Sequence, residues 1–186
     1  MPISIEEIAQ KLHEGKTILY PTDTIYGIGC DATNERAIDK LFDIKKRPKS
    51  KSLIVLVQHL EMLKQYVSIN NEIEQFIATL KIPTTIIYSN PRNLASNTIN
   101  ADGTVAIRIP NHAFCQALLQ AFGKPIISTS ANISGENNPI HFNSISKEIK
   151  AAVDIVIGKE MDTSTYQQAS ALVKINKDFS LEYIRK

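Results

Sequence analysis

Cysteine and long apolar runs are scarce in this sequence, and each scarcity excludes a class of protein. The two cysteines of the 186 residues, Cys30 and Cys115, form no CxxC motif, so we predict no disulfide framework and no zinc-binding cysteine cluster. No apolar run reaches the roughly 18 residues of a transmembrane helix, and residues 1–10 lack the pattern of a signal peptide. We therefore expect a reduced, cytoplasmic protein that does not bind a membrane.

Common nucleotide-binding and metal-binding motifs are absent as well. The sequence contains neither GxxxxGK[ST] nor GxGxxG, which argues against a P-loop enzyme and a dinucleotide-binding domain. The histidines are scattered, so structural or surface roles are favoured and no protein-held metal is predicted. The net charge of +2 provides no global field for nucleic acid, so any basic patch must be local. A chain of this length is expected to form one domain spanning residues 1–186.

What the sequence does contain is an alternation of helical and strand patterns. Ser4 and Glu7 form a capping box for a helix ending near His13, and Asn34 can cap a helix that Pro48 stops. Further helices are predicted at 60–66, 71–80, 113–122 and 144–152. Apolar runs predict strands at 17–20, 53–57, 84–88, 104–109, 125–128, 154–157, 171–175 and 181–184, the last two as a hairpin. Helices and strands that alternate early and strands that pair late predict an α/β fold with a mixed, twisted sheet.

Two segments between these elements have a distinct composition. Gly27 and Gly29 predict a turn, or a place where the backbone passes close to another group. The polar segment 89–103 is long for a loop of a compact domain, and such loops are usually functional or mobile. We consider it a candidate lid.

Polar side chains gather near the ends of the predicted strands. Hydroxyls follow the first strand, five cations occupy seven positions before the second, and further polar residues mark later strands: Thr22, Thr24; Lys45, Lys46, Arg47, Lys49, Lys51; Thr104, Arg108; Ser128, Ser130, Asn132. If the first two strands are neighbours, their polar groups share one sheet edge, where ligands of α/β sheets bind. Hydroxyls and an arginine fork suit a polyphosphate. Alternatively, the basic run is a solvated helix end and segment 130–135 is only a turn.

Four separated motifs, in order, resemble one family. PTDTIYGIGCDA, then IKKRP with SLIVLV, TVAIRIP and STSANISG resemble the YrdC/TsaC family of threonylcarbamoyl-AMP synthases over nearly the whole chain. The resemblance implies a single-domain YrdC-like α/β fold, whose open sheet and flanking helices form a deep basic cavity. It also implies a nucleotidyltransferase that joins L-threonine, bicarbonate (or CO2) and ATP into threonylcarbamoyl-AMP with release of pyrophosphate. The product would serve threonylcarbamoyladenosine modification of tRNA.

The resemblance further implies roles for individual residues. The catalytic set, which holds the nucleotide and its phosphates, comprises Lys45, Arg47, Ser130 and Asn132. L-Threonine would be bound by Thr24, Arg108 and Ser128. Contacts to ATP are expected from Arg47, Lys51, Thr104, Ser130, Asn138 and Arg185. Mg²⁺ would accompany ATP through its phosphates, and partner proteins would carry the product to tRNA.

The chain also departs from the family pattern. Lys51, Leu56 and Asn138 stand where many relatives have asparagine, a threonine-contacting histidine and serine, and segment 169–173 is a loose version of PSTVV. The second domain of longer relatives is expected to be absent. Two alternative functions remain. One is a non-catalytic module that binds tRNA or double-stranded RNA through a basic face. The other is a carbamoyl-adenylate-forming relative, although the acylphosphatase and zinc-finger-like segments of that group are missing.

Overall fold

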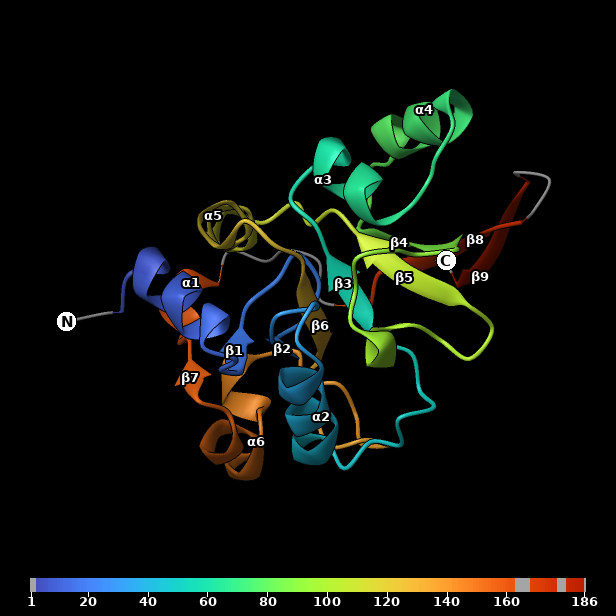
Figure 1. Cartoon of the computed structure of the whole chain (residues 1–186). Helices are drawn as coiled ribbons and strands as arrows, with labels where there is room; N and C mark the ends of the chain where they lie inside the picture. The colour runs from blue at the N-terminus through green and yellow to red at the C-terminus, as the bar shows by residue number, and fades with distance from the viewer. Residues whose placement is uncertain (1–2, 163–167, 177–179, 186) are drawn as a thin grey trace.

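The structure, a computed structural model, describes residues 3–162, 168–176 and 180–185 (Figure 1). Its strands are β1 (Ile18–Tyr20), β2 (Gly27–Gly29), β3 (Ile54–Leu56), β4 (Thr84–Ser89), β5 (Thr104–Arg108), β6 (Ile126–Ser130), β7 (Ile155–Val156), β8 (Ala171–Ile175) and β9 (Leu181–Arg185). Its α-helices are α1 (Ile5–His13), α2 (Glu35–Ile44), α3 (Leu60–Tyr66), α4 (Asn71–Thr79), α5 (Ala113–Phe122) and α6 (Lys147–Ala152). Short 3₁₀ turns lie at Ser96–Thr98, Phe142–Ser144 and Lys159–Met161.

All the described strands belong to one open sheet, in the order β7-β1-β2-β6-β3-β5-β4-β8-β9. Three neighbouring pairs, β1–β7, β3–β5 and β4–β8, are parallel, and the others are antiparallel. The predicted mixed sheet is thus confirmed, as is the final hairpin of β8 and β9, although residues 177–178 of its turn lie outside the described residues. The first two predicted strands are not neighbours, because β2 and β6 lie between β1 and β3.

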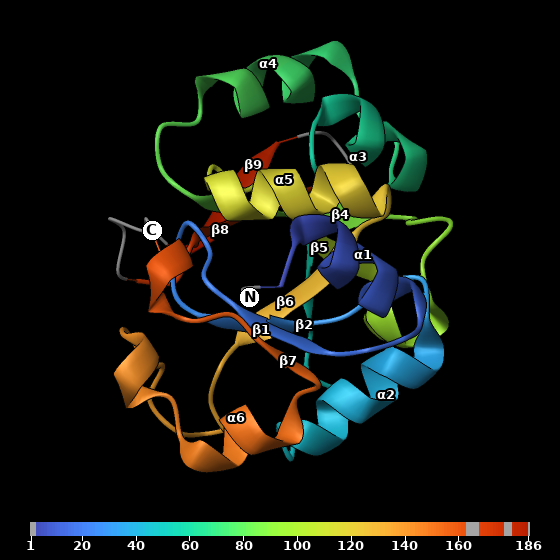
Figure 2. The same cartoon turned by 90° about the vertical axis from the view of Figure 1, so that its left-hand side faces the viewer.

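Helices cover both faces of this sheet. Figures 1 and 2 show α1 and α5 packed together on one side of β1, β2 and β6, with α2 and α6 on the opposite side. Successive strand residues alternate between the two layers. Leu19 and Ile127 join the core beneath α2, whereas Ile18, Tyr20 and Ile126 join the core beneath α1 and α5. The sheet centre is therefore buried on both faces.

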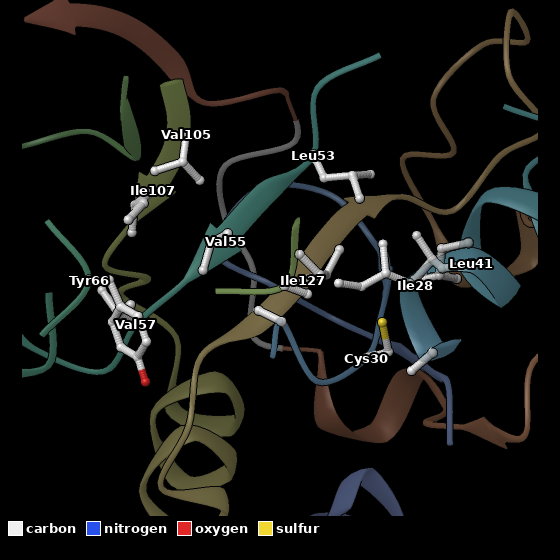
Figure 3. Close-up of a cluster of buried hydrophobic side chains, with 14 of the residues drawn as sticks. Ile28, Cys30, Leu41, Leu53, Val55, Val57, Tyr66, Val105, Ile107 and Ile127 are labelled. Atoms are coloured by element: carbon white, nitrogen blue, oxygen red, sulfur yellow. The ribbon is translucent and has the colours of Figure 1, made fainter. Parts of the chain in front are cut away.

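The larger core extends across several strands. Figure 3 shows side chains from β2, β3, β5 and β6 gathered against side chains from α2 and α3, and they include Ile28, Val55, Ile107 and Ile127 of the strands with Leu41 and Tyr66 of the helices. Each of these side chains is buried, and burying each of the aliphatic ones contributes about 1.5–3 kcal/mol. This core fixes the strands whose ends carry the polar residues of interest.

Several local predictions are confirmed. Ser4 and Glu7 form the reciprocal capping box of α1, and the Asn34 side chain accepts hydrogen bonds from two backbone N–H groups at the start of α2. Helix α2 ends at Ile44, earlier than the predicted stop at Pro48. The backbone N–H groups of Lys46 and Arg47 donate back to Asp43 and Phe42, and Lys46 adopts a left-handed φ of 49°, as in a Schellman motif.

Two predicted turns are strands instead. Gly27 and Gly29 lie in β2, and Thr129 and Ser130 extend β6 beyond its predicted end at residue 128. The expected close approach is nevertheless present, because a Cβ atom on Gly29 would lie 2.0 Å from the Ile127 carbonyl oxygen. Glycine is therefore required here for β2 to pair with β6.

The long segment 89–103 is held against the helices. Asn97 Nδ2 donates to Asp39 Oδ1 at 2.9 Å, Ser96 Oγ donates to Glu35 Oε1 at 2.7 Å, and Arg92 donates to Ser68 Oγ at 3.0 Å. These bonds tie it to α2 and to the end of α3. Among the described helices, none is long and apolar enough to cross a membrane.

Candidate active site

A hollow of about 250 Å³ lies over the central strands. Residues from distant parts of the chain line it, and they include most of the predicted site residues: Thr24, Arg47, Arg108, Ser128, Ser130, Asn138 and Arg185. Of the polar groups after β1 and before β3, Thr24 and Arg47 meet here, whereas the lysines of the basic run are absent from the described lining. The expectation that the two sets meet because their strands are neighbours is wrong, since β2 and β6 lie between β1 and β3.

Strand register brings the hydroxyl groups of β6 into this hollow. Ser128 pairs with Ile54 of β3, and Ser130 pairs with Gly27 of β2. Because the two serines are two positions apart on one strand, both face the same side. A Cβ atom on Gly27 would lie 2.8 Å from Ser128 Oγ, so the glycine leaves room for that hydroxyl. Ser130, the first residue of segment 130–135, is thus part of the site's wall, and the segment is not only a turn.

Three guanidinium groups give the hollow its charge. Arg47 Nη2 donates to the Ser52 carbonyl at 2.7 Å, and Arg185 donates through Nε and Nη2 to the Ser170 carbonyl at 2.9 and 2.8 Å. Burial lowers the pKa of Arg47, although an arginine stays charged at neutral pH. The third, Arg108, is 4% exposed. None of the described lining residues is a carboxylate, so the hollow suits an anionic ligand.

The turn after β1 is held by its own hydroxyl groups. Thr22 Oγ1 donates to the Ile25 carbonyl at 2.8 Å and accepts from the Thr24 N–H at 3.1 Å, and the two threonine hydroxyls lie 2.9 Å apart. Both threonines are buried. This network fixes the backbone that presents Thr24 to the hollow.

Lys45 lies beneath the site and does not line it. The side chain is fully buried, and its Nζ donates to the Asn132 carbonyl at 2.8 Å and also to the Ser130 carbonyl. Burial, and next the positive charge of Arg47, lower the pKa of Lys45 to about 7. Its observed contacts hold the backbone of residues 130–132 in place. A direct contact between Lys45 and phosphate stays a prediction.

Three other predicted residues lie outside the lining. Asn132 Nδ2 donates to the Glu136 carbonyl at 2.7 Å. Thr104, at the opposite end of β5 from Arg108, donates from Oγ1 to Asp102 Oδ1 at 2.6 Å. Lys51 is exposed. The departure at Leu56 is buried in the core under α5, whereas the departure at Asn138 faces the hollow. The roles proposed for these residues stay predictions.

The basic run before β3 is divided among different environments. Lys46 Nζ pairs with Glu148 Oε1 and Lys49 Nζ pairs with Asp39 Oδ1, each at 2.7 Å, and both lysines are well exposed. Lys45 is buried, and the exposed Lys51 does not line the hollow, so Arg47 is the member of the run that faces it. Most of the run therefore does not form an uncompensated basic patch.

Sequence reasoning missed several residues near the site. Ser52, Thr129 and Ser170 also line the hollow. Ser52 and Ser170 give carbonyl oxygens to the two guanidinium groups, and a backbone acceptor leaves no signal in the side-chain pattern. A further missed residue is Asp23, between Thr22 and Thr24, whose Oδ1 lies 3.2 Å from Arg108 Nη2. Its place inside the TDT motif was the available signal for that residue.

A second cavity, of about 360 Å³, adjoins the first. It lies between the α3–α4 segment and strands β4 and β5, and polar and apolar surface line it in about equal measure. Arg108 lines both cavities, whereas Asp23 lines the second one and Thr24 the hollow. The Asp23–Arg108 pair thus stands where the two spaces meet.

The described lining of the hollow offers no cluster of side chains that could coordinate a metal ion. Among the residues that the structure describes, no group of three histidine, cysteine or acidic side chains could hold one. Magnesium prefers carboxylate, water and phosphate oxygens, and the described lining offers hydroxyl and guanidinium groups instead. The chain's own residues do not fit a dedicated Mg²⁺ site.

Known proteins resemble this chain over most of its length. A protein named threonylcarbamoyl-AMP synthase from Aliivibrio fischeri is 36% identical over 136 residues, which cover 71% of this chain and 74% of that protein. One of the same name from Pseudoalteromonas translucida is 33% identical over 169 residues, covering 85% and 89%.

Solved structures share the fold. P. abyssi Sua5 in complex with L-threonine superposes with a TM-score of 0.81 and 27% identity, over 91% of this chain and 50% of that one, so the present chain spans about half of its length. E. coli YciO superposes with a TM-score of 0.84 at 22% identity, over 98% and 88%. The family model Sua5/YciO/YrdC, described as "Telomere recombination", matches residues 10–186. This chain therefore belongs to the Sua5/YciO/YrdC family.

Proposed function

We propose that this protein is a threonylcarbamoyl-AMP synthase, which forms L-threonylcarbamoyladenylate and pyrophosphate from L-threonine, bicarbonate and ATP. One observation of the site carries the proposal: Arg47, Arg108 and Arg185 converge with serine and threonine hydroxyls on one hollow, and no described lining residue is acidic. Guanidinium groups bind carboxylate and phosphate oxygens two at a time. The names of relatives that match along most of the chain give the same activity.

The chemistry fits a site without a protein nucleophile. The threonine amine attacks bicarbonate to give a carbamate and water, and a carbamate oxygen then attacks the α-phosphorus of ATP. The bond from that phosphorus to the bridging oxygen breaks, and pyrophosphate leaves with the electron pair. Both nucleophiles belong to the substrates, so the protein's task is to position them and to neutralise charge. Within the described lining, the reactive side chains are hydroxyls and guanidinium groups.

Individual residues suit separate parts of this task. Arg47 and Arg185 would neutralise phosphate oxygens of ATP, and a backbone carbonyl group orients each guanidinium. Arg108, Thr24 and Ser128 would receive L-threonine. Ser130 would contact the adenylate, and Lys45 would keep Ser130 in register through the backbone. Mg²⁺ would arrive bound to the phosphates of ATP and supply further charge neutralisation.

The place of the reaction in the cell is also part of the proposal. The product would serve tRNA modification through partner proteins in the cytoplasm. A purely RNA-binding module is not favoured, since the relatives carry the name of a synthase and two lysines of the basic run are paired with acidic residues. Direct contact with tRNA stays a prediction.

Pyrophosphate release tests the proposal. Purified protein receives ATP and bicarbonate with L-threonine present or absent, and the same assay is run on Arg47→Ala and Arg36→Ala. We expect threonine-dependent release that falls about a hundredfold in Arg47→Ala, a loss typical of removing one charge-stabilising group. Arg36 is exposed on α2 and away from the lining, so its variant should match the wild type. A wild type that releases no pyrophosphate under any condition refutes the proposed function.

A further inference from the structure

Asp23 is a buried carboxylate that lies beside the hollow without lining it. Its side chain is 5% exposed, and its Oδ1 lies 3.2 Å from Arg108 Nη2, whose side chain is 4% exposed. A buried charge is tolerated when another charge or hydrogen bonds compensate it. Within the described part of the chain, Asp23 is the one acidic partner of Arg108. The orientation of this arginine therefore depends on Asp23.

Asp23 is itself held from two sides. Its Oδ2 accepts a hydrogen bond from the Asn111 N–H at 3.1 Å, in the segment between β5 and α5. Its backbone belongs to the turn that the Thr22 hydroxyl closes through bonds to Ile25 and Thr24. A carboxylate anchored at both ends has little freedom to follow the arginine, so the arginine must follow the carboxylate.

Arg108 has space on both sides. It lines the hollow and also the adjoining cavity of about 360 Å³. Arg108 Nε and Asp23 Oδ1 are both buried without a hydrogen-bond partner, so the contact with Asp23 is an ion pair by distance and the guanidinium keeps unused N–H donors. Without Asp23, no acidic side chain in the described linings of the two cavities would hold the guanidinium in its place between them.

We propose that Asp23 is a positioning residue for the amino-acid substrate: it fixes Arg108 between the two cavities so that the unused N–H donors face the carboxylate of L-threonine in the hollow. This inference rests on the proposed function. Asp23 touches no substrate in this scheme and acts through Arg108 alone. The expected signature is weaker threonine binding with an intact phosphate site.

The test compares Asp23→Asn with a matched control. Asparagine keeps the shape and can still accept from the Asn111 N–H, but it removes the charge that holds Arg108. We expect the KM for L-threonine to rise about ten- to a hundredfold, the cost of misplacing a binding group, with the KM for ATP nearly unchanged. Asp31→Asn is the control, because Asp31 is 3% exposed and pairs with Lys124, also at 3.2 Å, away from the hollow. It should leave the KM for L-threonine unchanged.

A double variant keeps the test decisive if Asp23→Asn folds poorly. Arg108→Gln and Asp23→Asn/Arg108→Gln both lack the buried guanidinium that Asp23→Asn leaves without its acidic partner, so the two variants can be compared. If Asp23 acts through Arg108, the two variants have the same KM for L-threonine. A further rise in the double variant overturns the inference, and so does an unchanged KM in a folded Asp23→Asn. An inactive wild type would instead refute the proposed function, which separates the two failures.

Discussion

Replacing Lys45 by methionine should change how stability depends on pH. The ammonium is fully buried, and its pKa falls from its ordinary 10.5 to about 7 because of burial and the charge of Arg47. The unfolded chain therefore holds a proton on Lys45 between pH 7 and 10.5 that the folded chain lacks. Stability rises with pH wherever the unfolded state binds more protons. The loss of folding stability caused by burying the charged Lys45 is therefore complete below pH 7 and disappears toward pH 10.5.

The size of this effect follows from the two pKa values. Each pH unit inside the window contributes at most about 1.4 kcal/mol. At pH 7 the folded lysine is already half deprotonated, so the wild type gains about 2 kcal/mol from this group between pH 7 and pH 9. Methionine keeps much of the apolar stem and removes the titration. It also removes the two hydrogen bonds to the carbonyls of Ser130 and Asn132, each worth about 1 kcal/mol.

Urea unfolding at pH 7 and pH 9 measures the difference. The chain has no tryptophan, so far-UV circular dichroism is the suitable signal. We expect the free energy of unfolding of the wild type to rise about 2 kcal/mol more than that of Lys45→Met over this interval. Lys46→Met is the control, because Lys46 is exposed and its hydrogen bond with Glu148 raises its pKa. Equal changes in the wild type and Lys45→Met would refute the reasoning.

Three further predictions concern stability, each measured by urea unfolding. Gly29→Ala places Cβ 2.0 Å from the Ile127 carbonyl oxygen, so we expect a loss of about 3 kcal/mol as β2 parts from β6; an unchanged midpoint would contradict this. Asn34→Ala removes the cap of α2 and should cost about 1 kcal/mol, with Asn137→Ala, at an exposed position outside the helices and strands, as a control that should not. Burial would raise the pKa of Asp154, but hydrogen bonds from Lys40 and Thr17 lower it to about 2, so its stabilisation is present above pH 4 and is lost as pH falls toward 2. Asp154→Asn should be less stable by about 1–2 kcal/mol at pH 7, and a difference from wild type that persists at pH 2 would refute this origin.

The helices were predicted well because the residues that begin and end them act on their own neighbours in the sequence. The capping residues Ser4 and Asn34 act within three residues of their own position, and Gly123 ends α5 with a left-handed φ of 68°. Such contacts can be read from neighbouring letters of the sequence. Strand β2 could not be predicted in this way, because its glycines become a strand only when β1 and β6 pair with it on both sides.

The site was predictable in composition but less so in arrangement. The motifs named most of the residues that line the hollow, yet Lys45 and Arg47 have opposite environments although they are two positions apart. The difference comes from carbonyl groups of residues 130 and 132, more than 80 positions away in the chain. The ion pairs of Lys46 and Lys49 depend likewise on α6 and α2. Partners that come together only through the fold leave no periodic pattern in the sequence.

The central place of β6 has a consequence for how the chain acquires its structure. This strand joins β2 to β3, although residues 126–130 follow both by some seventy positions or more. During synthesis, the β1–β2 hairpin and the β3–β5 pair emerge with unfilled edges and can meet only after β6 has left the ribosome. Pairing over such separations is slow, and open edges invite contact with other chains. We therefore expect fragments that end before residue 126 to aggregate, and nascent chains of that length to depend on chaperones.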